Sequence, residues 1–216
     1  MKVSVIIPYN EDRGGLHQAI RAAENQDGFK LGIDYEIIPQ FGDFTVGKNI
    51  NDAVKKAKGE YIKICAEDDE LTENCLITLY ELATDGYDLV CANAIRISPE
   101  PKFRGYWNSS IPELVSDLAK ENTINGGTIL YRKETMPVWD EDMWCAEEYD
   151  VSLRMAAAGL RFGHIAEYVF CYRMWRGQKS RVTLSTAQRT EFDMERQEYI
   201  FNLRLKYLNN HNKIQR

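Results

Sequence analysis

The chain has 216 residues, and 44% of them are hydrophobic, which is enough to bury one sizeable core. Its formal net charge is -6, and no stretch is rich in lysine and arginine, so nucleic acid is not expected as a partner. The five cysteines are scattered and no apolar run reaches the roughly 18 residues of a membrane span, so we expect a cytoplasmic protein with no transmembrane segment.

The first half of the chain alternates expected strands and helices. Short β-branched runs predict strands, and apolar residues three or four positions apart predict helices. In chain order these elements are a strand at 2–7, a helix at 14–25, a strand at 35–38, a helix at 46–58, a strand at 61–65, a helix at 72–84 and a strand at 88–97. The alternation predicts an α/β fold whose mostly parallel central sheet is flanked by helices and holds ligands at the carboxyl ends of its strands.

The second half is less regular. Residues 98–110 combine prolines, a glycine and aromatic residues, which indicates a long loop that could act as a lid. Further expected elements are strands at 127–131 and 161–173 and a helix at 146–158. From 185 to 208 apolar residues recur at helical spacing and predict a long amphipathic helix. We therefore expect a main domain at 1–184 and a helical extension at 185–216 packed on it.

Four consecutive acidic residues, from Glu67 to Glu70, follow the expected strand at 61–65. Carboxylates this close together repel one another unless a cation or hydrogen-bond donors lie among them. The cluster is either a metal site or a solvated turn that caps a helix starting at Leu71. Taken alone, this segment favours the solvated turn.

Three sequence segments lie at the boundaries of the expected strands and helices and form one ordered pattern. Pro8-Tyr9-Asn10-Glu11 follows the first strand, Ala66-Glu67-Asp68-Asp69 follows the third, and residues 146–154 open a late helix. In this order they resemble the family 2 glycosyltransferases, which have the GT-A fold. Shorter matches lie at 57–62, 126–128 and 171–173, so the resemblance covers roughly residues 2 to 181.

The resemblance implies a reaction and two central residues. The reaction is transfer of a sugar from a nucleotide diphosphate donor to the hydroxyl of a glycan or another acceptor, with inversion. In the family the motif after the third strand holds a divalent cation, manganese or magnesium, and its last carboxylate corresponds to Asp68. The general base corresponds to Glu148. Such a site must stabilise a leaving diphosphate and take a proton from the acceptor hydroxyl.

The resemblance implies further binding residues, and the basic run after Arg173 adds Arg176 and Lys179 as a possible clamp on the diphosphate. The donor-binding set is Pro8, Tyr9, Glu11, Asn51, Glu67, Asp68, Arg173, Arg176 and Lys179. The acceptor-binding set is Gly127, Glu147 and Asp150. Each set has a structural alternative: the acidic residues of the late helix could simply favour its positive end, and the basic run after Arg173 could be a solvated surface instead of a clamp on the diphosphate.

Three positions depart from the family pattern. Ala66 stands where the first metal-binding aspartate is usual, Glu148 replaces an aspartate, and Trp175 replaces a histidine. A catalytically silent sugar-nucleotide or glycan binding module is therefore a second hypothesis, although the retained Asp68 and Glu148 favour an enzyme. A third, a nucleotidyltransferase, has only Gly14-Gly15 beside one arginine as a weak phosphate loop.

Overall fold

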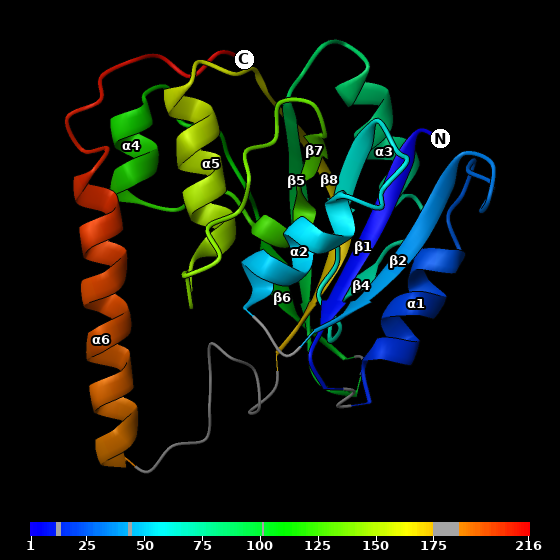
Figure 1. The fold of residues 1–216 in the computed structure, drawn as a ribbon, viewed down its shortest axis with the longest axis horizontal. Helices are drawn as coiled ribbons and strands as arrows, with labels where there is room; N and C mark the ends of the chain where they lie inside the picture. The colour runs from blue at the N-terminus through cyan, green and yellow to red at the C-terminus, as the bar shows by residue number, and fades with distance from the viewer. Residues whose placement is uncertain (12–13, 43–44, 101, 175–185) are drawn as a thin grey trace.

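The computed structural model describes residues 1–11, 14–42, 45–100, 102–174 and 186–216 (Figure 1). Within these residues, eight strands form one mixed sheet, in the order β2-β1-β3-β7-β5-β8-β4, with β6 paired to β5. The strands are β1 (Val3–Tyr9), β2 (Tyr35–Phe41), β3 (Tyr61–Ile64), β4 (Glu70–Leu71), β5 (Leu89–Ile97), β6 (Phe103–Trp107), β7 (Leu130–Arg132) and β8 (Phe162–Arg173). The helices are α1 (Leu16–Glu24), α2 (Val46–Val54), α3 (Cys75–Ala83), α4 (Val115–Lys120), α5 (Glu147–Ala157) and α6 (Thr186–Leu205), with a 3₁₀ turn η1 (Gly126–Thr128).

The predicted α/β fold with a mostly parallel sheet is confirmed. Strands β1, β2, β3, β5 and β8 run in one direction, whereas β4, β6 and β7 run against their neighbours. The reversed strands are short, and β7 separates β3 from β5. The carboxyl ends of the five parallel strands therefore meet at one edge of the sheet, where an α/β protein holds its ligands.

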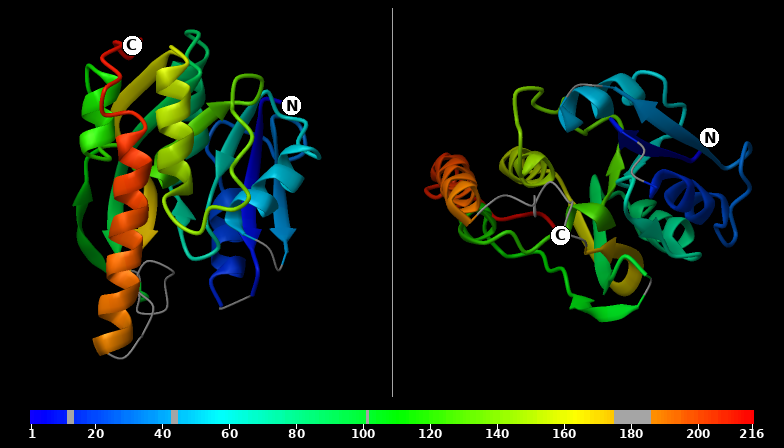
Figure 2. Two further views of the ribbon diagram at one scale, coloured as in Figure 1. Left: turned by 60° about the vertical axis from the view of Figure 1, so that its left-hand side comes forward. Right: turned by 90° about the horizontal axis from the view of Figure 1, so that it is seen from below.

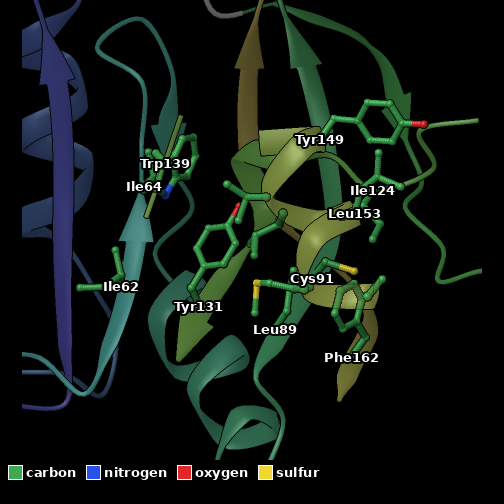
Figure 3. Close-up of a cluster of buried hydrophobic side chains, with 14 of the residues drawn as sticks. Ile62, Ile64, Leu89, Cys91, Ile124, Tyr131, Trp139, Tyr149, Leu153 and Phe162 are labelled. Atoms are coloured by element: carbon green, nitrogen blue, oxygen red, sulfur yellow. The ribbon is translucent and has the colours of Figure 1, made fainter. Parts of the chain in front are cut away.

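Strand alternation builds two hydrophobic layers. On β1, Ile6 joins the cluster under α2, α4, α5 and α6, whereas Val5 and Ile7 join the cluster under α1 and α3. On β5 the same rule sends Leu89 to the first cluster and Val90 to the second. The right-hand view of Figure 2 shows helices on both faces of the sheet, and Figure 3 shows the first cluster. The sheet is therefore the middle layer of three.

Several expected boundaries were wrong. The region 98–110 is not one loop, because β6 pairs there antiparallel with β5. The expected strand at 127–131 begins as the turn η1, and only Leu130–Arg132 is strand. The helix expected from residue 72 starts at Cys75, and Glu70–Leu71 forms β4, so the acidic cluster does not cap a helix at Leu71. The short helix α4 was not expected at all.

The carboxyl-terminal helix packs on the rest of the chain. Leu203 of α6 and Ile214 beyond it are buried in the first hydrophobic cluster. The ring of Tyr199 lies 5.7 Å from the ring of Trp144. After α6 the chain turns back, and the Ile214 amide donates to the Glu113 carbonyl. In the part of the chain that the structure describes, no helix is both long and apolar enough to cross a membrane.

Candidate active site

The acidic motif forms a tight turn at the carboxyl end of β3. The chain leaves β3 at Ile64, and the Asp69 amide donates to the Ala66 carbonyl at 3.1 Å. The start of α1 lies against this turn, because a Cβ added at Gly15 would be 2.6 Å from the Glu67 carbonyl oxygen. Glycine is thus needed for this close approach. The sequence prediction of an acidic motif at the carboxyl end of a strand is correct in position.

Arg173, at the end of β8, binds the acidic turn. Its amide donates to the Asp69 carboxylate at 2.8 Å, and its Nε donates to the Asp68 carbonyl at 2.9 Å. Its guanidinium also pairs with Glu70 and donates to the Pro99 carbonyl at 2.5 Å. The side chain is buried, so these bonds form in a low-dielectric environment. Sequence predicted Arg173 as a donor contact, but the structure gives it a bond to each of three neighbouring segments.

Burial also sets the protonation of Asp69. Removal from water raises the pKa of this carboxyl well above its ordinary value, the neighbouring Asp68 charge raises it further, and Arg173 acts in the opposite direction. A raised folded-state pKa means that the folded protein holds this proton more tightly than the unfolded chain does. The contribution of Asp69 to stability is therefore largest below the ordinary carboxyl pKa and falls as the pH rises through the raised value.

The predicted base lies at the start of α5. Among the described residues, Ala146 is the one non-glycine residue with positive φ, at φ 60° and ψ 28°. An alanine in the left-handed region is strained, and such strain is often found at functional sites. It directs the chain into the first turn, which carries the buried Glu147 and the partly exposed Glu148. Glu148 lies against η1, because a Cβ at Gly126 would be 2.7 Å from the Glu148 Cβ and Cγ.

A buried lysine links the glycine turn to the strand that precedes the acidic turn. Lys63 of β3 is fully buried, and its ammonium donates to the Gly127 carbonyl at 2.5 Å and to the Ile64 carbonyl at 2.9 Å. It also lies 5.0 Å from the centre of the Phe170 ring. Burial lowers the pKa of Lys63. Sequence analysis missed this residue, although a lysine in the middle of an apolar strand is a signal in itself.

The predicted donor residues near the amino terminus lie at the carboxyl end of β1. Pro8 and Tyr9 end this strand, and Glu11 is exposed just beyond it. The Tyr9 ring packs 5.5 Å from that of Phe41, which ends β2 and is 55% exposed. Figure 1 shows the ends of β1 and β2 and the first turn of α5 toward the same lower side of the molecule. The aromatic pair therefore lies at the carboxyl end of β1, which pairs with β3, the strand that leads into the acidic turn.

Asn51 has a structural environment instead. Its amide nitrogen donates to the Trp139 carbonyl and to the Glu141 carboxylate, both at 2.9 Å. Its oxygen accepts from the Trp139 amide at 3.0 Å. Both amide hydrogens are used within the protein, so Asn51 fixes the 139–141 segment to α2. The predicted donor residues Arg176 and Lys179, and Trp175 with them, lie outside the described residues.

The predicted acceptor residues differ in what they contact. The Gly127 amide donates to the Asn125 side chain, and the Gly127 carbonyl accepts from the Lys63 ammonium, so the backbone of Gly127 is fixed on both sides. The Asp150 carboxylate accepts from Arg154 Nε at 2.7 Å, one turn along α5. Glu147 is buried at the helix start. The structure thus brings Gly127 beside Gly126 and Glu148, whereas Asp150 has an ion pair within its own helix.

The described residues do not form a ready metal cage. No group of three or more histidine, cysteine, aspartate or glutamate side chains among them could hold a metal ion. Asp69 and Glu70 are both bound by Arg173, while Glu67 and Asp68 are partly exposed. This donor set fits a cation that brings most of its other ligands from a diphosphate and from water, as magnesium commonly does.

The model of the family described as glycosyl transferase family 2 matches residues 29–146, which is more than half of the chain. The chain therefore belongs to this family. None of the curated proteins compared with the chain is similar enough in sequence to match it.

Solved structures of S. aureus TarS have the same fold. Residues 1–349 of TarS superpose with a TM-score of 0.63 at 14% identity, over 80% of this chain and 60% of that one. The same fragment in complex with UDP gives a TM-score of 0.61 at 14% identity, over 82% and 61%. Its complex with UDP-GlcNAc gives 0.62 at 16% identity, over 86% and 62%. The chain thus spans about 60% of that fragment's length, and the expected GT-A-like fold is confirmed.

The bonds of Arg173 lead to the first prediction. Arg173→Lys keeps the charge but cannot make the forked set of bonds, so buried oxygens lose donors. The free energy of unfolding should fall by about 2 kcal/mol in urea titrations. The control Arg96→Lys alters a half-buried arginine that stacks 5.1 Å above Trp107, and should cost less than about 1 kcal/mol. Unchanged stability with weaker binding of UDP would instead make Arg173 a donor contact.

Proposed function

We propose that this chain transfers a sugar from a nucleotide diphosphate donor to an acceptor hydroxyl, with inversion at the anomeric carbon. The observation that carries the proposal is the link between the two predicted centres. Lys63 lies on the strand that leads into the acidic turn and binds Gly127, while the neighbouring Gly126 lies against Glu148. The segments proposed to hold the metal and phosphates and to supply the base are therefore joined by one short set of contacts, which supports a direct displacement.

The donor would bind at the carboxyl ends of β1 and β3. Tyr9 and Phe41 offer an aromatic face to a nucleobase, with Pro8 and Glu11 beside it. We propose uridine as the first base to test, because TarS, which has the same fold, was solved with UDP and UDP-GlcNAc. Asp68 and Glu67 would lie near the diphosphate.

A divalent cation would be held by Asp68 together with the diphosphate. Bound there, it would neutralise the charge that grows on the leaving diphosphate. The basic residues Arg176 and Lys179 would act on the same oxygens as a clamp, because guanidinium and ammonium groups pair well with phosphate. Only one motif carboxylate is assigned to the metal, so fixed cations would share this task.

Glu148 would be the general base. Its carboxylate takes the proton of the acceptor hydroxyl while that oxygen bonds to the anomeric carbon and the bond to the diphosphate breaks. Attack from the face opposite the leaving group inverts the anomeric carbon in a single step. Gly127, Glu147 and Asp150 would border the acceptor, which is a glycan or another molecule with a free hydroxyl. We also propose a reducing, cytoplasmic setting, because the five cysteines are free and four of them are buried.

The second prediction concerns Glu148. Glu148→Gln keeps the shape of the side chain but cannot accept the proton, so turnover should fall by about 10² to 10⁴-fold while donor binding is nearly kept. Transfer from UDP-sugars would be measured as release of UDP. Glu147→Gln and Asp150→Asn are matched controls on the same turn and should lose much less. If one of these two is the inactive variant, the base has been assigned to the wrong residue.

The third prediction concerns the cation. Manganese should bind weakly or not at all to the free protein and tightly in the presence of UDP, because Asp69 and Glu70 are already bound by Arg173. Isothermal titration with and without UDP measures both. Tight manganese binding without nucleotide, or UDP binding that a chelator leaves unchanged, would contradict it. UDP binding with no transfer to any acceptor would favour the silent binding module.

The fourth prediction concerns Arg176 and Lys179. Replacing both with alanine should weaken UDP binding by about tenfold or more through the loss of two phosphate contacts. The melting temperature should stay the same. Lys55→Ala is a suitable control, because Lys55 pairs with Asp52 on the exposed side of α2. An unchanged affinity for UDP would mean that the basic run is a solvated surface. A lower melting temperature that accompanies weaker binding would show a structural role.

A further inference from the structure

One buried hydroxyl beside the proposed base has no hydrogen-bond partner. Tyr131 of β7 is 0% exposed, and its hydroxyl is unpaired among the residues that the structure describes. Most buried polar groups are satisfied, and leaving one unpaired costs stability that phenylalanine at the same position would not lose. A tyrosine retained under this cost calls for a role beyond packing.

The surroundings of this hydroxyl point to α5. The Tyr131 side chain lies in the cluster between the sheet and α5, and Figure 3 shows it rising from β7 toward the helix that carries Tyr149 and Leu153. The ring packs edge-on against Trp139, with ring centres 6.2 Å apart, which fixes its orientation. The hydroxyl is thus held toward the helix whose first turn carries Glu148.

Two titratable groups act on the Tyr131 hydroxyl. They are Glu148 of α5 and the thiol of Cys91 of β5. Burial raises the pKa of Tyr131 well above its ordinary value, and the Glu148 charge raises it further. Burial also raises the pKa of Cys91 to about 12, so this thiol stays neutral. The phenol therefore keeps its proton, and Glu148 is the acidic side chain to which its hydroxyl can donate a hydrogen bond.

We propose that Tyr131 is a positioning residue for Glu148. The Tyr131 hydroxyl donates a hydrogen bond to the Glu148 carboxylate when the site is occupied. Catalytic hydrogen bonds are often long in the free enzyme and tighten when substrate binds. The bond orients the carboxylate toward the acceptor hydroxyl, and because it stabilises the charged form it keeps the base ionised at lower pH. This role rests on the proposed function of Glu148.

The test compares two tyrosines of the same core. Tyr131→Phe should leave the melting temperature unchanged or raise it, lower kcat by about 10- to 100-fold and leave KM for the UDP-sugar unchanged. The acid limb of its rate profile should move to higher pH. Tyr149→Phe is the control, because the Tyr149 hydroxyl donates to the Leu118 and Ala119 carbonyls at 2.8 Å and 3.0 Å. It should lower the melting temperature and leave the acid limb where it is.

A double-mutant cycle separates this inference from the proposed function. The effect of Tyr131→Phe on melting temperature, measured with UDP present, should differ between the wild type and the Glu148→Gln background. If no sugar is transferred but the cycle shows coupling, the proposed function fails and the contact remains. Equal effects in both backgrounds, or an unchanged kcat and acid limb in an active enzyme, would overturn the role of Tyr131.

Discussion

The candidate site depends on the buried guanidinium of Arg173. One side chain binds the turn after β3, the short strand β4 and the segment between β5 and β6. Without it, the Asp68 and Pro99 carbonyls would lose donors and Glu70 would lose its ion-pair partner. The arginine side chain therefore fixes the backbone of the acidic turn and the Glu70 carboxylate. Glu70 pairs with the guanidinium and the buried Asp69 accepts from the Arg173 backbone amide, whereas Glu67 and Asp68 are partly exposed.

Lys63, on the strand β3 that precedes the acidic turn, also joins separate segments through a buried positive charge. A fully buried ammonium costs much of its hydration, and this cost is offset by two backbone carbonyls and the face of Phe170. The carbonyl of Gly127 belongs to the turn that lies beside Glu148. Movement of β3 would thus be transmitted to the base through one short hydrogen bond. The position of the acidic turn relative to Glu148 is thus fixed in part by the buried side chain of Lys63.

Much of the fold could be predicted because the buried strands follow simple patterns. The run from Val3 to Ile7 is fully apolar apart from one serine and sends alternate side chains to two helical layers, so its strand character is plain in the sequence. The strand β6 was hidden, because prolines and Gly105 in that segment resemble a loop, and its pairing with β5 depends on tertiary contacts. The six residues of α4 are too few for helical periodicity to be recognised.

For the candidate site, the positions of residues along the chain could be predicted from the sequence, whereas their contacts could not. Chain position alone put the acidic motif at the end of β3 and Glu148 at the start of α5, since both follow from element order. What Arg173 and Asn51 do depends on residues far along the chain, and what Tyr131 does depends on Glu148 of another element, which no local pattern records. A satisfied arginine and an unsatisfied tyrosine look equally polar in a sequence. Only their surroundings show that the arginine braces the acidic turn and that the tyrosine hydroxyl has no partner among the described residues.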